Sequence, residues 1–183
     1  MNVPNLLTLS RLPLSAVLFL AIAREWWAVA LVTFLVASLT DWADGYLARK
    51  WDQTSAFGRT FDPLIDKVMV GGAFIYLLMV PSSGLLPWMV AVIIGRELLI
   101  TGIRGHLESM GYRFGADWFG KLKMFLQCIY LGWYFFLQSI DPPEALWYVH
   151  TGLLWGMLLA TIGSGLQYLA RSLRMLQTPP PAP

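Results

Sequence analysis

The chain has 183 residues, of which 57% are hydrophobic and only 13% are charged, and its mean hydropathy is positive. This composition excludes an ordinary soluble domain and indicates a polytopic membrane protein. The length allows about six spans of roughly 20 residues and leaves no room for a sizeable soluble domain. Any catalytic or binding chemistry is therefore expected inside the helix bundle.

Six apolar segments predict an all-α fold with six transmembrane helices. They lie at residues 4–23, 27–48, 62–80, 86–105, 121–139 and 146–170. We expect residues 1–176 to form a single integral-membrane domain and residues 177–183, which are rich in proline, to form a disordered tail. The single cysteine, Cys128, excludes an intrachain disulfide and a cysteine-based metal site.

The first segment carries Asn5, Thr8 and Arg11 at a spacing of three. On a helix this spacing gives one polar stripe, which predicts a short interfacial segment at the N-terminus. Arg11, the apolar run after it and Ala21-Ile22-Ala23 also imitate a cleavable signal peptide, and the polar stripe argues against that alternative.

The distribution of charge predicts the orientation of the spans. If the N-terminus is cytoplasmic, twelve of the thirteen Lys and Arg residues fall on the cytoplasmic side, and only Arg24 falls outside. This asymmetry is a strong positive-inside signal. Both termini and the functional face are therefore expected in the cytoplasm.

Four carboxylates lie inside or beside the second and third apolar segments: Asp41, Asp44, Asp62 and Asp66. A carboxylate near the bilayer centre costs about 2.5–3.5 kcal/mol on insertion scales, so four without compensation would cost about 10 kcal/mol. A polar cavity or a bound divalent cation compensates such charges, and hard cations such as Mg²⁺ and Ca²⁺ take oxygen ligands. The four side chains are therefore candidate metal ligands.

The spacing of these aspartates predicts that they converge. Asp41 and Asp44 share one helix face, and Asp62 and Asp66 share a face of the next helix. At ~1.5 Å of rise per residue, both pairs lie about 8 Å inside the cytoplasmic edge of the membrane core. Two antiparallel helices would thus present four carboxylates at one level.

Small residues beside the carboxylates leave room for a ligand. Gly45 and Ala48 follow the first pair, and Gly58 precedes the second. The alternative is that individual aspartates cap helices or face water at the interface. Asp62 before Pro63 does resemble a helix start, with proline at the first helical position.

The carboxylate region resembles the signature of the CDP-alcohol phosphatidyltransferase family at every fixed position: Asp41-x2-Asp44-Gly45-x2-Ala48-Arg49-x8-Gly58-x3-Asp62-x3-Asp66. Three flanking segments are similar, more loosely, to the bacterial branch that uses glycerol 3-phosphate: NVPNLLTLSR, IIGRELLITGIR and GKLKMFLQ. The resemblance extends from Asn2 to about Gln127.

The resemblance implies a multi-pass enzyme of the bacterial inner membrane, expected to form a homodimer. CDP-diacylglycerol and an alcohol, glycerol 3-phosphate in this branch, would give a phosphatidyl product and CMP. Two divalent ions, Mg²⁺ or Mn²⁺, would bridge the carboxylates and the pyrophosphate.

The family's pattern also implies a role for each residue of the signature. Asp66 would be both metal ligand and general base. The remaining metal ligands would be Asp41, Asp44 and Asp62. The nucleotide would be bound at Asp41, Asp44, Gly45, Ala48, Arg49 and Gly58.

The acceptor phosphate needs cations of its own. The candidates are Lys67, Arg96, Arg104, Arg113, Lys121 and Lys123. Arg96 follows the apolar run WMVAVIIG, so it is a charge at the membrane edge, where a functional role is expected.

Two rival functions remain for comparison. A cation transporter also needs intramembrane carboxylates, but its site is expected near the midplane between repeats, whereas these lie at one edge within two consecutive spans. Another acceptor, namely inositol phosphate, serine or phosphatidylglycerol, would suit the same signature. Basic residues interleaved with aromatics occur only on the predicted lipid-facing rim, so no nucleic-acid partner is expected.

Overall fold

The computed structural model describes the backbone of residues 3–50, 56–112 and 118–177, and the side chains of residues 9–41, 64–112 and 118–177. All regular secondary structure in these ranges is helical, which confirms the all-α prediction. The elements are α1 (Val3–Ala23), α2 (Trp27–Lys50), α3 (Ala56–Leu77), the 3₁₀ turn η1 (Pro81–Ser83), α4 (Pro87–Ser109), α5 (Trp118–Ser139) and α6 (Glu144–Leu176).

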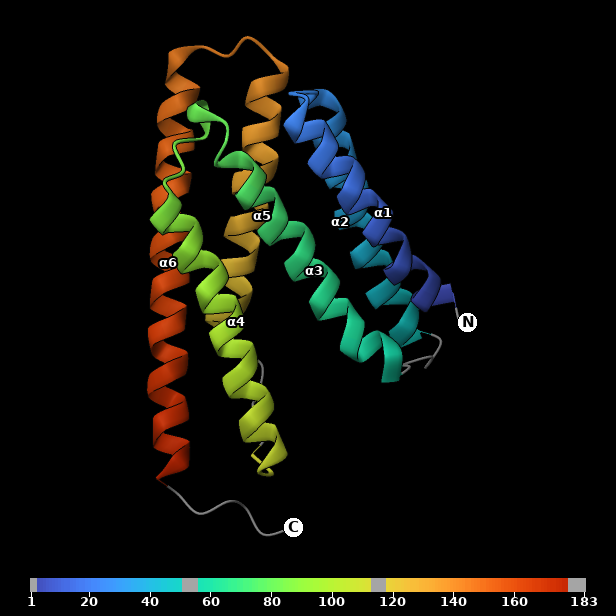
Figure 1. Ribbon diagram of the computed structural model, residues 1–183, viewed down its shortest axis with the longest axis vertical. Coiled ribbons are helices and arrows are strands. Elements are labelled where there is room, and N and C mark those ends of the chain that lie inside the picture. Colours follow the sequence, from blue (N-terminus) through green and yellow to red (C-terminus); the bar gives the residue numbers. More distant parts are fainter. Residues whose placement is uncertain (1–2, 51–55, 113–117, 178–183) are drawn as a thin grey trace.

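The helices alternate in direction, so their connections collect at two ends (Figure 1). We name the end that holds the α1–α2, α3–α4 and α5–α6 connections the outer end, and the opposite end, toward which both termini lie, the inner end. This alternation agrees with the predicted up-and-down order of six segments.

Uncommon backbone conformations and prolines make the turns at the outer end. Glu25, between α1 and α2, has φ 55°, and Gly84, which follows η1, has φ 68°. Pro87 occupies the first turn of α4, where its missing N–H has no partner to lose. Pro143 caps the start of α6 in an extended conformation.

The predicted start of the third helix was wrong. α3 begins at Ala56, well before residue 62, so Asp62 and Pro63 lie within the helix. A proline removes one backbone donor, and long apolar helices absorb that loss by local adjustment. Pro13 likewise lies inside α1, which runs unbroken from Val3 to Ala23.

The apolar core fills the outer end. It draws on the second halves of α1, α3 and α5 and the first halves of α2, α4 and α6, and its largest members include Leu18, Ile22, Phe34, Phe74, Tyr130, Tyr134 and Phe135. The carbonyl of Ser83 ties η1 to this core, because it accepts from Tyr130 Oη at 2.7 Å and from His150 Nε2 at 3.0 Å. His150 is thus a core residue.

Large apolar side chains also cover the outside of the bundle. Leu98, Leu159 and Leu166, for example, are 66%, 66% and 64% exposed. An apolar surface of this extent favours contact with lipid. Among the described residues, only α6 has the length and apolar composition of a membrane span, and Leu9–Ala23 and Trp27–Asp41 form shorter apolar stretches. The six-span arrangement therefore stays a prediction.

Candidate active site

The interior becomes polar toward the inner end of the bundle. The buried polar side chains there are Arg11, Lys123, Gln127, Thr161, Ser164 and Ser172. The hydroxyls of Thr161 and Ser172 donate to the carbonyls of Met157 and Tyr168, one turn earlier on α6. Thr161 Oγ1 also accepts from Gln127 Nε2 of α5 at 3.5 Å. The charged side chains need partners from other elements.

Arg11 joins the two predicted site aspartates whose side chains are described. Its Nη1 donates to Oδ1 of Asp41 on α2 and to Oδ1 of Asp66 on α3. The Arg11 side chain is fully buried, whereas those of Asp41 and Asp66 are 45% and 23% exposed. The two carboxylates therefore converge, as their helical spacing predicted, with a cation between them.

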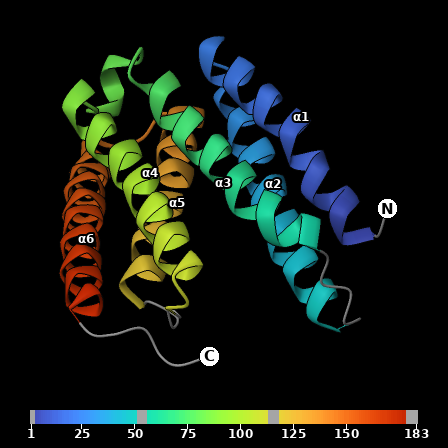
Figure 2. The same ribbon diagram turned by 60° about the horizontal axis from the view of Figure 1, so that its bottom comes forward.

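A cavity of about 600 Å³ begins beside Asp66. It lies between α3, α4 and α5, with Phe19 of α1 along one side. α3 and α4 diverge from η1 toward the inner end in both views (Figures 1 and 2). Most of the lining is apolar, and its polar members are Asp66, Lys67, Glu97, Thr101, Lys123 and Gln127.

The two lysines in the cavity wall come from different helices. Lys67 Nζ donates to Thr101 Oγ1 across the gap between α3 and α4. Lys123 of α5 is buried, and its Nζ donates to Oε1 of Glu97 on α4. Both lysines therefore line the same cavity as Asp66, while their ammonium groups are bonded to other side chains.

Arg96 is directed toward α6. Its Nη1 donates to Glu97 Oε1 and its Nη2 to Ser164 Oγ, each at 3.2 Å. Gly165 gives it space, because a Cβ there would lie 3.1 Å from Arg96 Cγ. Arg96 therefore donates to the same Glu97 oxygen as Lys123, and it does so from the side that faces α6.

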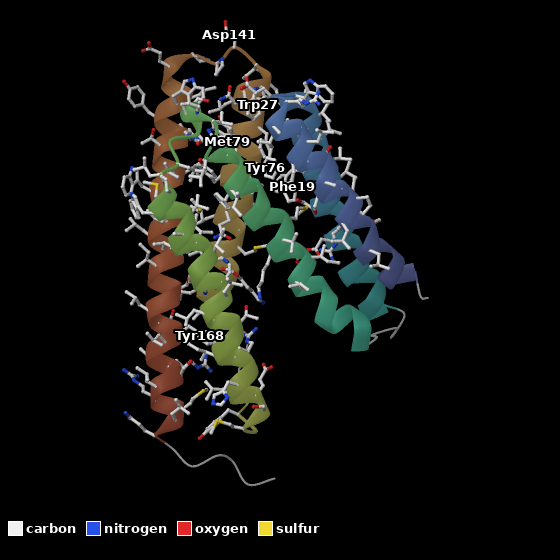
Figure 3. The ribbon with its side chains drawn as sticks, in the orientation of Figure 1. Phe19, Trp27, Tyr76, Met79, Asp141 and Tyr168 are labelled. Carbon is white, nitrogen blue, oxygen red and sulfur yellow. The ribbon has the colours of Figure 1, made fainter. Side chains whose placement is uncertain are left out.

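The apolar part of the cavity depends on a close contact between α1 and α3. A Cβ at Gly72 would lie 2.2 Å from Phe19 Cζ, so only glycine leaves space for this ring. The ring stacks on Tyr76 with centroids 5.1 Å apart (Figure 3). Phe19 and Gly72 both line the cavity.

Several predicted site residues lie outside the described side chains. Asp44, Gly45, Ala48 and Arg49 belong to α2, and Gly58 and Asp62 belong to α3, where only the helix itself is described. Arg113 falls in residues 113–117, outside the described residues. The proposed roles of all seven stay predictions.

Two of the remaining acceptor candidates are exposed. Lys121 faces outward at the start of α5. Arg104 lies 3.9 Å from Glu108 across one turn of α4 and 5.9 Å from the ring centroid of Tyr168, whose place on α6 Figure 3 shows. The cavity therefore favours Lys67 and Lys123 over these two.

Sequence patterns did not predict the contacts that Arg11 and Glu97 make in this site. Arg11 was interpreted only as a topological charge in a polar stripe, although a lone arginine inside an apolar helix is itself a signal for a buried acidic partner. Glu97, which follows Arg96, was not among the predicted site residues. Its contact with Lys123, 26 residues away, belongs to the tertiary structure.

Two carboxylates converge here, and among the described residues no group of three or more His, Cys, Asp or Glu side chains could hold a metal ion. Oxygens of Asp41 and Asp66 bond the same nitrogen atom, so they lie close enough to share one small ligand. Carboxylate oxygens are the donors that Mg²⁺ prefers. Asp44 and Asp62 belong to the same two helices but lie outside the described side chains, so the full set of four ligands stays a prediction.

The chain resembles known proteins over nearly its whole length. Residues 1–163 match the sequence profile of the family described as CDP-alcohol phosphatidyltransferase. The chain is 35% identical over 175 residues to the CDP-diacylglycerol–glycerol-3-phosphate 3-phosphatidyltransferase of Shigella flexneri serotype 5b (strain 8401), covering 92% of this chain and 93% of that protein. It is 34% identical over 177 residues to the protein of the same name from Escherichia coli (strain K12), with the same coverage.

Proposed function

The chain belongs to the CDP-alcohol phosphatidyltransferase family, and from this premise we propose that it transfers the phosphatidyl group of CDP-diacylglycerol to glycerol 3-phosphate. The products are phosphatidylglycerol phosphate and CMP. The observation that carries the proposal is a single cavity. Its polar lining includes Asp66, Lys67 and Lys123, and most of its other lining is apolar. A lipid substrate and a phosphorylated acceptor need this combination.

The carboxylates set the position of the reaction. Asp41, Asp44, Asp62 and Asp66 would hold one or two divalent ions, Mg²⁺ or Mn²⁺. When bound, these ions neutralise the pyrophosphate and the developing charge on the leaving oxygen. The nucleotide lies against α2 and the start of α3, where Gly45, Ala48 and Gly58 leave space and Arg49 contacts phosphate.

Asp66 acts as the general base. An acceptor hydroxyl attacks the phosphorus next to diacylglycerol, its proton passes to the Asp66 carboxylate, and the bond from that phosphorus to the CMP oxygen breaks. Positioning supplies most of the rate, because an in-line displacement needs no covalent group from the protein. Asp66 suits this role because it lines the cavity from which the acceptor approaches.

The acceptor phosphate is bound by Lys67 and Lys123. Both line the cavity beside Asp66, and an ammonium is a compact charge suited to phosphate. Arg96 contributes through its bond to Glu97, whereas the exposed Arg104 and Lys121 provide positive charge at the inner end. Arg113 stays a further candidate for the acceptor phosphate. In glycerol 3-phosphate, the phosphate at one end would then bind the two lysines, and the hydroxyl at the other end would meet Asp66.

The protein spans the cytoplasmic membrane of a bacterium six times, with both termini and the cavity entrance at the cytoplasmic side. The exposed leucines on the outer faces of α4 and α6 and the positive-inside charge distribution support this arrangement. Residues 1–176 act as one domain, and the protein forms a homodimer, which the family resemblance alone suggests.

The decisive experiment offers one acceptor at a time. Purified protein in lipid nanodiscs receives CDP-diacylglycerol, Mg²⁺ and either glycerol 3-phosphate, inositol phosphate, serine or phosphatidylglycerol, and CMP and the lipid product are identified by mass spectrometry. We expect phosphatidylglycerol phosphate with the first acceptor only, and no CMP in excess EDTA. Turnover with another acceptor alone would overturn the proposed substrate, and full turnover in EDTA would overturn the role of the metal.

A further inference from the structure

Glu97 connects three helices through its carboxylate. Its Oε1 accepts from Lys123 Nζ on α5 and from Arg96 Nη1 on its own helix α4, and Arg96 in turn reaches Ser164 on α6. The side chains of Lys123, Arg96 and Glu97 are only 3%, 12% and 19% exposed. This is a partly buried group of charges, and it forms part of the cavity wall.

A buried ammonium is stable only with a counter-charge. Without one it releases its proton or turns toward water, and in both cases it is lost as a binding group. Glu97 is the described carboxylate that bonds Lys123. One carboxylate between two cations also leaves an excess of one positive charge, which an anionic ligand can use.

We propose that Glu97 is a positioning residue that holds the Lys123 ammonium, in its charged form, at the cavity wall where the acceptor phosphate binds. The inference rests on the proposed function, since it takes glycerol 3-phosphate as the acceptor. Glu97 acts through Lys123 and does not touch the reacting atoms.

The test is a double-mutant cycle on the KM for glycerol 3-phosphate. Glu97→Ala raises this KM about tenfold or more, the loss expected for one charged hydrogen bond, while the KM for CDP-diacylglycerol changes less than twofold. Glu97→Gln keeps an oxygen that accepts from Lys123, so it raises the KM less. In a Lys123→Ala background, Glu97→Ala adds almost nothing, because the group it positions is gone.

A matched control lies on the same helix. Glu108 pairs with the exposed Arg104, so Glu108→Ala leaves both KM values near those of the wild type. If Glu97→Ala does not fold, as judged by its thermal unfolding, the same cycle is carried out with Glu97→Gln.

Three outcomes overturn the proposal. If Glu97→Ala has the same effect with and without Lys123, Glu97 acts through another group. If the KM values for both substrates change equally, its role is generally structural. If the KM for glycerol 3-phosphate falls, Glu97 repels the phosphate. Failure of the proposed function is separate, because the wild type would then release no CMP with glycerol 3-phosphate.

Discussion

Arg11 and Asp66 form an ion pair between residues 55 positions apart, in which a fully buried guanidinium bonds the carboxylate that we assign as general base. The same nitrogen atom also bonds Asp41. Arg11 of α1 therefore offsets one of the two negative charges that Asp41 and Asp66 bring together. A divalent ion bound here would contact the same two carboxylates as the Arg11 guanidinium.

Removing Arg11 should make stability depend more strongly on metal. Arg11→Ala removes this cation from between Asp41 and Asp66, so in EDTA the free energy of unfolding should fall by about 1.5–3 kcal/mol, the range for hydrogen bonds to charged groups. Mg²⁺ should then raise the thermal unfolding temperature of the variant more than that of the wild type. Unfolding is followed in nanodiscs with and without Mg²⁺.

Arg24→Ala is the matched control for this experiment. Arg24 is exposed at the outer end of α1, with its guanidinium 6.0 Å from the ring centroid of Trp26. Its loss should not change the response to Mg²⁺. An equal Mg²⁺ response in the Arg11 variant and the wild type would contradict the shared-carboxylate account.

Two adjacent glycines should tolerate alanine very differently. Gly72→Ala drives a methyl group into the Phe19 ring, so it should destabilise the fold by about 1–3 kcal/mol and disturb the cavity wall. At Gly71 the nearest atom to a Cβ is Ile94 Cγ1 at 3.9 Å, an ordinary contact. Gly71→Ala should be neutral or gain about 0.5–1 kcal/mol, because it is a glycine inside a helix.

Thermal unfolding and the KM for CDP-diacylglycerol distinguish the glycine variants. A Gly72→Ala protein as stable as Gly71→Ala would mean that Phe19 moves away without cost, and that the ring does not shape the cavity.

The two lysines at the start of α5 provide a test of the acceptor site. Lys123 is buried in the cavity wall, whereas Lys121 is exposed. Lys123→Ala should raise the KM for glycerol 3-phosphate at least tenfold, the loss of one charge-assisted hydrogen bond. Lys121→Ala should change it less than twofold. Similar effects of both changes would indicate a diffuse attraction by surface charge, which high salt would abolish.

Much of the fold follows from local features of the sequence. Apolar runs separated by Arg24–Trp26, by the PSSGLLP segment and by Asp141-Pro142-Pro143 predicted the helices to within a few residues, except at the start of α3 and the end of α6. Helical spacing also predicted that Asp41 and Asp66 approach each other. In each case a regular period or a breaking residue carries the information.

The contacts of Arg11 and Glu97 could not be predicted in this way. Periodicity tells which face a side chain occupies but not which distant helix packs against that face. Arg11 meets α2 and α3, and Glu97 meets α5, only because the bundle packs in this order. The size of the cavity likewise depends on how far α3 and α4 diverge.

The catalytic role of Asp66 is tested most directly by Asp66→Asn, with Asp41→Asn, the other carboxylate bonded by Arg11, as its matched comparison. The asparagine side chain keeps the shape and one ligand oxygen but loses the basic site, so CDP-diacylglycerol should still bind while kcat falls by about 10²–10⁴-fold, the usual range for loss of a general base. Asp41→Asn should instead weaken metal and nucleotide binding together. The measurement is kcat for CMP release alongside equilibrium binding of CDP-diacylglycerol, and a near-normal kcat in Asp66→Asn would contradict the account.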